Sequence, residues 1–279
     1  MTKVAVITGA SRGIGKACAL ALARRGYRVV VTGRTLEEGK GIVAKPYAAD
    51  AAASVTVSGS VGSTVGAIRG GGGEAIGVAL DIMSQSSIDA MLDEVLEKWG
   101  RIDVLVNNAI YNGAGLMYAF GEFSMEQLEA CLRGTVVNQV YITRKVLPAM
   151  LERGEGTFFF MGSVAGLGPS PVPVTKGGWG FLHGASKSAF HRIAEFLHLE
   201  HAKDGIRSFL VEPQLTVTES SIALFGDAVS NLGGGMQGHP PEVTGEVVAW
   251  LATEDRAGRH AGKVLSTPKF FAEHGIARG

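Results

Sequence analysis

Short apolar runs alternate with amphipathic stretches along most of the chain, and this alternation predicts strands separated by helices. The expected strands are 3–8, 27–32, 75–80, 102–106, 156–162, 206–211 and 263–266. The expected helices are 13–25, 86–99, 184–203 and 241–252, with a longer one from the Ser124–Gln127 capping box to about Leu151. Strands that alternate with helices in this way form a parallel sheet covered on both faces. We therefore predict a single α/β domain.

Two segments interrupt this rhythm. Residues 48–73 are rich in Ala, Ser, Gly and Val and predict an enlarged connection after the second strand, with a helix only at about 60–69. Residues 213–240 contain several glycines and the apolar patch 222–225. Because a loop of this length in a compact domain is usually functional, we predict that it forms a lid over a substrate.

Composition and charge narrow the class of protein. The chain has 279 residues, of which 46% are hydrophobic, and so it can bury a full core. Its 26 basic and 26 acidic side chains balance, which favours neither a nucleic-acid nor a membrane partner. The first strand follows Met1-Thr2-Lys3 directly, which leaves no room for a signal peptide, and no apolar segment reaches membrane-spanning length. Cys18 and Cys131 match no metal or redox spacing. We expect a reduced, cytoplasmic protein and assign no metal site.

The strongest local signal is VAVITGASRGIG at residues 4–15, which predicts a strand, a glycine turn and the start of a helix. Gly9, Gly13 and Gly15 allow the backbone to turn tightly and to approach a pyrophosphate closely. The N–H groups at the helix start attract the negative charge of such a group. The alternative is a glycine turn that only joins strand to helix. The flanking strand and helix favour dinucleotide binding.

Further motifs follow this turn in order. They are Asp81-Ile82, Asn107-Asn108-Ala109, Asn138 in the long helix, Ser163 after the fifth strand and Lys187 in the next helix. In this order they resemble the motifs of the short-chain dehydrogenase/reductases over nearly the whole chain. The resemblance implies a Rossmann-type, doubly wound sheet, a nicotinamide dinucleotide, a small-molecule substrate and a homotetramer or dimer. It assigns cofactor binding to Gly9, Ser11, Arg12, Gly13, Ile14, Gly15, Arg34, Asp81, Ile82, Asn108, Ala109, Lys187, Pro213 and Thr218.

The choice of cofactor depends on the end of the second strand. An acidic residue about 20 positions beyond the glycine turn would hold the ribose hydroxyls of NAD. Gly33 stands at that distance, and Arg34 follows it. Since no carboxylate repels a 2′-phosphate there, Arg34 and Arg12 are able to bind this phosphate by charge-assisted hydrogen bonds. We therefore predict NADP(H). In the alternative, both arginines are solvated and Glu37 or Glu38 replaces the acid.

The catalytic pattern of the family is a tyrosine followed four residues later by a lysine, both near a serine. His183 stands four residues before Lys187, and no tyrosine occurs between Ser163 and Lys187. Tyr141 and Lys145 have the same spacing but belong to the preceding helix, so we reject that pair. The resemblance then assigns catalysis to Asn138, Ser163, His183 and Lys187, with His183 in place of the tyrosine.

His183 changes the acid–base chemistry that the family motif implies. An unperturbed imidazole titrates near neutral pH, at about pH 6.5. The positive charges of Lys187 and of an oxidised nicotinamide disfavour imidazolium. Neutral His183 is then a general base for alcohol oxidation and a poorer acid for ketone reduction. In the alternative, His183 is only a polar cap at the helix start. Asp81 likewise has two compatible roles, in binding the adenine and in capping the next helix.

Other departures lie on the nicotinamide side, where Ile110 and Gln214 stand in place of the family's usual glycines. We expect the adenosine half of the site to be intact and the substrate half to be altered.

We predict an NADP(H)-dependent oxidoreductase that interconverts an alcohol and a ketone. Apolar and aromatic residues expected near the mouth of the site indicate a small, hydrophobic or ring-shaped substrate, although ordinary packing is the alternative role for most of them. They are Tyr111, Met117, Tyr118, Phe120, Phe123, Trp179, Phe181, Leu224 and Phe225. Two other functions stay open: a non-catalytic, NADP-binding subunit of an active partner, and a non-redox enzyme on the same fold.

Overall fold

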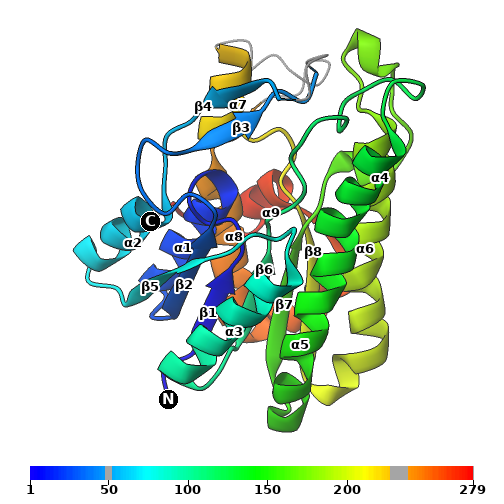
Figure 1. The fold of residues 1–279 in the computed structure, drawn as a ribbon. Helices are drawn as coiled ribbons and strands as arrows, with labels where there is room; N and C mark the ends of the chain where they lie inside the picture. The colour runs from blue at the N-terminus through cyan, green and yellow to red at the C-terminus, as the bar shows by residue number, and fades with distance from the viewer. Residues whose placement is uncertain (48–51, 227–237, 279) are drawn as a thin grey trace.

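A seven-stranded parallel sheet forms the centre of the molecule (Figure 1). The computed structural model describes residues 1–47, 52–226 and 238–278. The strands lie in the order β5-β2-β1-β6-β7-β8-β9, and each neighbouring pair is parallel. Their bounds are β1 Val4–Ile7, β2 Arg28–Gly33, β5 Ala75–Ala79, β6 Val104–Asn107, β7 Gly156–Met161, β8 Ile206–Glu212 and β9 Val264–Ser266. This confirms the predicted Rossmann-type, doubly wound sheet.

Helices cover both faces of the sheet, because the strands carry apolar side chains on both sides. In β7, Phe158 and Phe160 pack into one core cluster while Phe159 packs into the other, and all three are fully buried. One face is covered by α1 (Gly13–Arg24), α2 (Val61–Gly70), α8 (Pro241–Thr253) and α9 (Thr267–Glu273). The other is covered by α3 (Gln85–Trp99), α5 (Asn138–Arg153) and α6 (Phe181–His201).

The long helix expected from Ser124 onward is interrupted. The capping box is present, since Ser124 Oγ accepts from Gln127 N–H and Gln127 Oε1 accepts from Ser124 N–H. The helix α4 (Met125–Leu132) then passes into a π-helical turn at Arg133–Val137, and α5 follows. A π turn inserts one residue into the helical register and is frequent at functional sites. Here it lies directly before Asn138.

Several short elements were not predicted. An antiparallel hairpin of β3 (Ile42–Ala44) and β4 (Ser54–Thr56) lies between β2 and α2, partly inside the expected connection 48–73. The helix expected at about 60–69 is present as α2. A short helix, α7 (Glu219–Phe225), lies within the expected lid 213–240. Residues 48–51 and 227–237 of these two segments lie outside the described residues.

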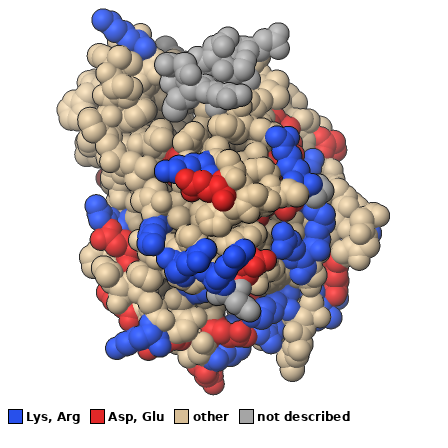
Figure 2. Space-filling view, turned by 180° about the vertical axis from the view of Figure 1, so that it is seen from behind, with Lys and Arg blue, Asp and Glu red and all other residues tan. Residues whose placement is uncertain are grey.

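The surface mixes charges of both signs. Figure 2 shows the face opposite to that of Figure 1, where Lys and Arg side chains are interspersed with Asp and Glu side chains. Ion pairs such as Arg28 with Glu74 contribute to this pattern. No helix in the described part of the chain is long and apolar enough to cross a membrane.

Gln214, directly after β8 and Pro213, is the only non-glycine residue with a positive φ (54°) among the described residues. Its backbone N–H donates to Glu212 Oε1 over 2.7 Å, and its side-chain Nε2 donates to Ser266 Oγ over 2.8 Å. The left-handed conformation costs an L-residue about 1–2 kcal/mol. The two hydrogen bonds hold Gln214 in a conformation that glycine would adopt freely.

A pair of substitutions measures this strain. Both Gln214→Gly and Gln214→Ala lose the hydrogen bond to Ser266, but only glycine relieves the strained φ. We expect the free energy of unfolding of the Gly variant to exceed that of the Ala variant by about 1 kcal/mol, measured by urea unfolding. Equal stabilities would show that the backbone at this position is unstrained.

Candidate active site

The carboxyl ends of the sheet strands surround a cavity of about 520 Å³. The strand order reverses between β1 and β6, which is where open α/β sheets bind their ligands. Because parallel strands end at the same edge, residues far apart in sequence meet in this cavity. Most lining residues come from the turns after β1 (9–15), β2 (33–35), β5 (80–83), β6 (108–113), β7 (161–162) and β8 (213–220). The others are Ile42 of β3, Leu116, and His183 and Lys187 of α6.

The glycine turn has the backbone that a phosphate site needs. Gly9 (φ 68°) and Gly13 (φ 55°) adopt the left-handed conformation. A Cβ on Gly15 would lie 2.3 Å from the Gly9 carbonyl oxygen, so that only glycine permits this close approach. Arg12 is the N-cap of α1 and offers the helix no side-chain cap. The N–H groups of the first helical turn therefore donate no hydrogen bond to the side chain of the N-cap residue. Helix starts that bind anions have this arrangement.

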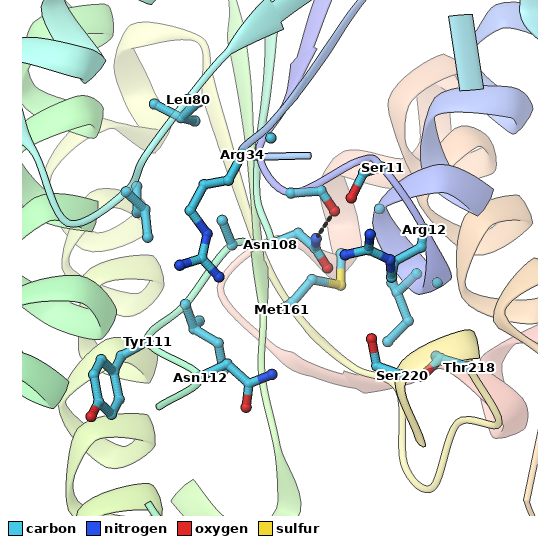
Figure 3. Close-up of a pocket in the computed structure, with 18 of the residues that line it drawn as sticks. Ser11, Arg12, Arg34, Leu80, Asn108, Tyr111, Asn112, Met161, Thr218 and Ser220 are labelled. Carbon is cyan, nitrogen blue, oxygen red and sulfur yellow. Dashed lines mark hydrogen bonds between the residues drawn. The ribbon is translucent and has the colours of Figure 1, made fainter. Parts of the chain in front are cut away.

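The end of β6 braces this turn. Asn108 Nδ2 donates to the carbonyl oxygens of Thr8 (2.8 Å) and Gly9 (3.0 Å). In Figure 3 a dashed line marks a hydrogen bond of Asn108. The backbone N–H groups of Asn108 and Ala109 both donate to Thr8 Oγ1. The predicted cofactor residues of β1 and β6 thus form one hydrogen-bonded unit across the switch point.

Arg34 and Arg12 both line the cavity (Figure 3). Their side chains differ in whether they already make hydrogen bonds within the protein. The Arg12 guanidinium donates to the carbonyl oxygens of Ser58 (2.8 Å) and Gly59 (2.6 Å), beyond β4. Arg34 is exposed, and its side chain makes no hydrogen bond or ion pair among the described residues. Of the two arginines expected to bind a 2′-phosphate, Arg34 is the one whose guanidinium is available to donate hydrogen bonds to it.

The carboxylates near Arg34 are already engaged. Glu37 pairs with Lys40 at 2.5 Å, and Glu38 Oε1 accepts from the Gly59 N–H over 2.6 Å. Neither lines the cavity. The geometry therefore disfavours the alternative in which Glu37 or Glu38 replaces the missing ribose-binding acid.

Asp81 lines the cavity, but it does not cap the following helix. Its Oδ1 accepts from the Met83 N–H over 3.0 Å, whereas the N-cap of α3 is Ser84, whose hydroxyl accepts from Ser87 N–H. The capping role considered for Asp81 is wrong, because the turn places Ser84 at the helix start.

Ser163 and His183 are in contact beside the cavity, which His183 lines and Ser163 does not. Ser163 follows β7, and His183 lies in the first turn of α6, with its Nε2 atom 3.3 Å from Ser163 Oγ. The N-cap of α6 is Gly180, and no side chain caps this helix. His183 Nδ1 is buried without a hydrogen-bond partner among the described residues. The imidazole thus contacts Ser163 rather than capping its helix.

Lys187 lies one helical turn after His183 and is almost fully buried. Its Nζ donates to the Met161 carbonyl oxygen over 2.6 Å and lies 5.0 Å from the ring centre of Phe190. Burial lowers the pKa of Lys187 to about 8. Burial, and then the charge of Lys187, lower the pKa of His183 to about 4. At neutral pH the imidazole is therefore neutral.

Asn138 does not line the cavity. Its Nδ2 donates to the Ile82 carbonyl oxygen over 2.6 Å, and its Oδ1 accepts from Gln85 Nε2 over 3.4 Å. It therefore holds the turn after β5 in place. The rejected pair Tyr141 and Lys145 binds Asp89 of α3 instead of facing the cavity.

Comparison with known proteins agrees with this geometry. The family described as short chain dehydrogenase matches residues 3–227. The chain belongs to the short-chain dehydrogenase family. An uncharacterized oxidoreductase of Staphylococcus saprophyticus is 33% identical over 219 residues, which cover 78% of this chain and 80% of that protein. A 3-oxoacyl-[acyl-carrier-protein] reductase of Synechocystis is 29% identical over 265 residues, covering 95% of this chain and 94% of the relative.

Solved structures of similar proteins extend the comparison. A variant of actinorhodin polyketide ketoreductase with NADPH is similar with a TM-score of 0.75 and 26% identity, and 95% of each chain is covered. A putative NAD(P) dependent gluconate 5-dehydrogenase from Beutenbergia cavernae with bound NADP has a TM-score of 0.73 and 25% identity over 95% of this chain and 94% of that one. This chain is thus a short-chain dehydrogenase-family oxidoreductase with the fold of nicotinamide-binding relatives.

Two residues that support Ser163 were missed by the sequence analysis. His191 Nε2 accepts the Ser163 N–H over 3.2 Å, and Glu212, at the end of β8, accepts the Gln214 N–H and lies near the backbone of Val164. Burial raises the pKa of Glu212, and burial followed by the charge of Lys187 lowers the pKa of His191 to about 4. The spacing of His183, Lys187 and His191, four residues apart on one helix, is a signal that could have identified His191.

The predicted aromatic mouth is only partly present. Of those nine residues, Tyr111 alone lines the cavity, together with the unpredicted Leu116. Phe120, Phe123 and Phe181 pack against one another instead, with ring centres 5.1–5.7 Å apart. Ordinary packing therefore accounts for these three rings.

The lowered pKa of His183 predicts a pH-dependent stability. An unfolded histidine takes up a proton below about pH 6.5, whereas folded His183 stays neutral down to about pH 4. Its contribution to stability is therefore full above pH 6.5 and is lost as the pH falls toward 4. Between pH 7 and pH 4.5, the unfolding free energy of the wild type should fall by about 2 kcal/mol more than that of His183→Gln. Parallel pH curves in urea unfolding would contradict the neutral, buried imidazole.

Proposed function

We propose that this oxidoreductase is NADP(H)-dependent and interconverts an alcohol and a ketone, with His183 as the acid–base group. The observation that carries the proposal is the contact between His183 Nε2 and Ser163 Oγ, 3.3 Å apart, because His183 lines the same cavity as the glycine turn. Lys187 also lines this cavity. Bound nicotinamide would supply the hydride acceptor or donor.

The residues of the cavity fit a dinucleotide. Gly9, Gly13 and Gly15 leave the backbone accessible at the start of α1, Asn108 and Ala109 brace the turn, and Asp81 and Ile82 line the adenosine end. Ser11, Ile14, Pro213 and Thr218 complete the lining. The relatives whose structures contain NADPH or NADP have the same fold, which supports this assignment.

The chain's own groups support the proton chemistry of an alcohol oxidation. Ser163 Oγ orients the substrate oxygen by a hydrogen bond, and neutral His183 Nε2 accepts the hydroxyl proton as the hydride leaves the carbon. His191 accepts the Ser163 N–H and so helps to fix the backbone that carries Ser163. Because the pKa of His183 is about 4, little imidazolium is present at neutral pH to protonate a ketone. The lowered pKa of His183 thus favours oxidation over reduction.

The cavity also favours a small, apolar substrate. Ile110, Tyr111, Leu116 and Met161 line it together with His183.

We retain a homotetramer or dimer as a prediction, which exposed apolar side chains support: Val137 next to α5 and Phe196 and Leu199 on α6 are more than half exposed.

Turnover by the purified protein tests the acid–base role. With NADP⁺ and a panel of small apolar alcohols, His183→Ala should lower kcat by about 10²–10⁴-fold, while the Kd for NADPH measured by fluorescence stays the same. If the wild type turns over nothing and His183→Tyr creates activity, the non-catalytic alternative replaces this proposal.

Cofactor selectivity tests Arg34. Removing a charge-assisted contact with a 2′-phosphate should weaken NADPH binding to Arg34→Ala roughly tenfold to a hundredfold, with little effect on NADH. Lys40→Ala makes the same charge change at an exposed residue paired with Glu37 and serves as the control. An equal loss for NADPH and NADH, or none, would refute the selective role.

A further inference from the structure

The carboxylate of Glu219 lies at the helix start that the proposed function assigns to a pyrophosphate. Glu219 Oε2 accepts a hydrogen bond from the Gly13 N–H over 2.8 Å. Gly13 is the first residue of α1, and its N–H is one of the donors that the helix cannot satisfy itself. An acidic side chain 206 residues away in sequence therefore satisfies a donor of the dinucleotide site.

The surrounding charges hold this carboxylate as they would hold a phosphate. Lys16 Nζ lies 4.0 Å from Glu219 Oε1. Burial lowers the pKa of Arg12, and the nearby negative charge of Glu219 opposes that shift. The positive end of the α1 dipole adds to the attraction. Two anions at this helix start would repel each other strongly, so the carboxylate and a phosphate compete for it.

Glu219 also anchors a larger unit. It is the first residue of α7, and at the other end of α7 the ring of Phe225 lies edge-on to Tyr47, with ring centres 5.8 Å apart. Tyr47 follows β3, and Figure 1 shows α7 beside the β3–β4 hairpin. We call α7 and this hairpin the cover. Arg12 donates to the carbonyl oxygens of Ser58 and Gly59, just beyond β4. The cover is therefore linked to the glycine turn at two points, through Arg12 and through Glu219.

We propose that Glu219 is an internal competitor for the dinucleotide site, and that its displacement by a diphosphate releases α7 from α1. This inference rests on the proposed binding of a pyridine dinucleotide. In the free protein the carboxylate satisfies the Gly13 donor and keeps the cover closed. Binding of a diphosphate takes over the donor, and α7 then loses its contact with α1.

Binding measurements separate this contact from a general charge effect. Glu219→Gln keeps the size of the side chain and removes its charge, and Glu37→Gln makes the same charge change at an exposed position. We expect Glu219→Gln to bind NADPH and ADP roughly tenfold tighter than the wild type. The affinity for 2′-AMP, which has no diphosphate, should stay within about twofold. Glu37→Gln should match the wild type for all three ligands.

Hydrogen–deuterium exchange of the peptide that spans α7 tests the coupling. ADP should speed its exchange in the wild type, whereas Glu219→Gln should show the faster exchange without ADP. Equal affinities in wild type and variant, a gain that extends equally to 2′-AMP, or exchange in α7 that ignores ADP would overturn the role of Glu219. If neither protein binds NADPH, NADH or ADP, dinucleotide binding itself fails, and this inference with it.

Discussion

Parallel strand pairing is the constraint on which the site depends. It brings every strand's carboxyl end to one edge of the sheet, so that turns more than 200 residues apart in sequence line one cavity. The closest approach lies between the turn after β1 and the end of β6, where Asn108 donates to the Thr8 and Gly9 carbonyls. A side chain on Gly15 would collide with the same Gly9 carbonyl. Small residues and one amide therefore fix the place where a phosphate would be bound.

Near Ser163, burial and a buried cation together determine the protonation of two histidines. Burial is the larger cause that lowers the pKa of His183 and His191, and the charge of Lys187, about one helical turn from each, adds to it. Both imidazoles are therefore neutral at physiological pH. Neutral His191 is able to accept the Ser163 N–H, which a protonated ring could not do. Burial, with the charge of Lys187 added to it, thus keeps His183 neutral and leaves His191 able to position Ser163.

Local patterns in the sequence were sufficient to predict the sheet. Each of the seven strands appears close to its predicted range, because buried parallel strands are continuous apolar runs that need no partner to be recognised. The glycine turn was visible from its spacing, and His183 from the resemblance to the family's motif, in which it stands four residues before Lys187. The β3–β4 hairpin was missed because its strands are only three residues long. The partners of Arg12, Gly13 and Ser163 were missed because they lie 28 to 206 residues away, and no local periodicity encodes such contacts.

The segment from Glu212 to Glu219 connects the two halves of the cavity. At one end, Glu212 lies near the backbone of Val164, beside Ser163, and at the other, Glu219 accepts the N–H of Gly13. Between them, Gln214 has a strained backbone that Glu212 and Ser266 hold in place. Eight residues of one strand end and its loop therefore link the helix start of α1 to the neighbourhood of Ser163.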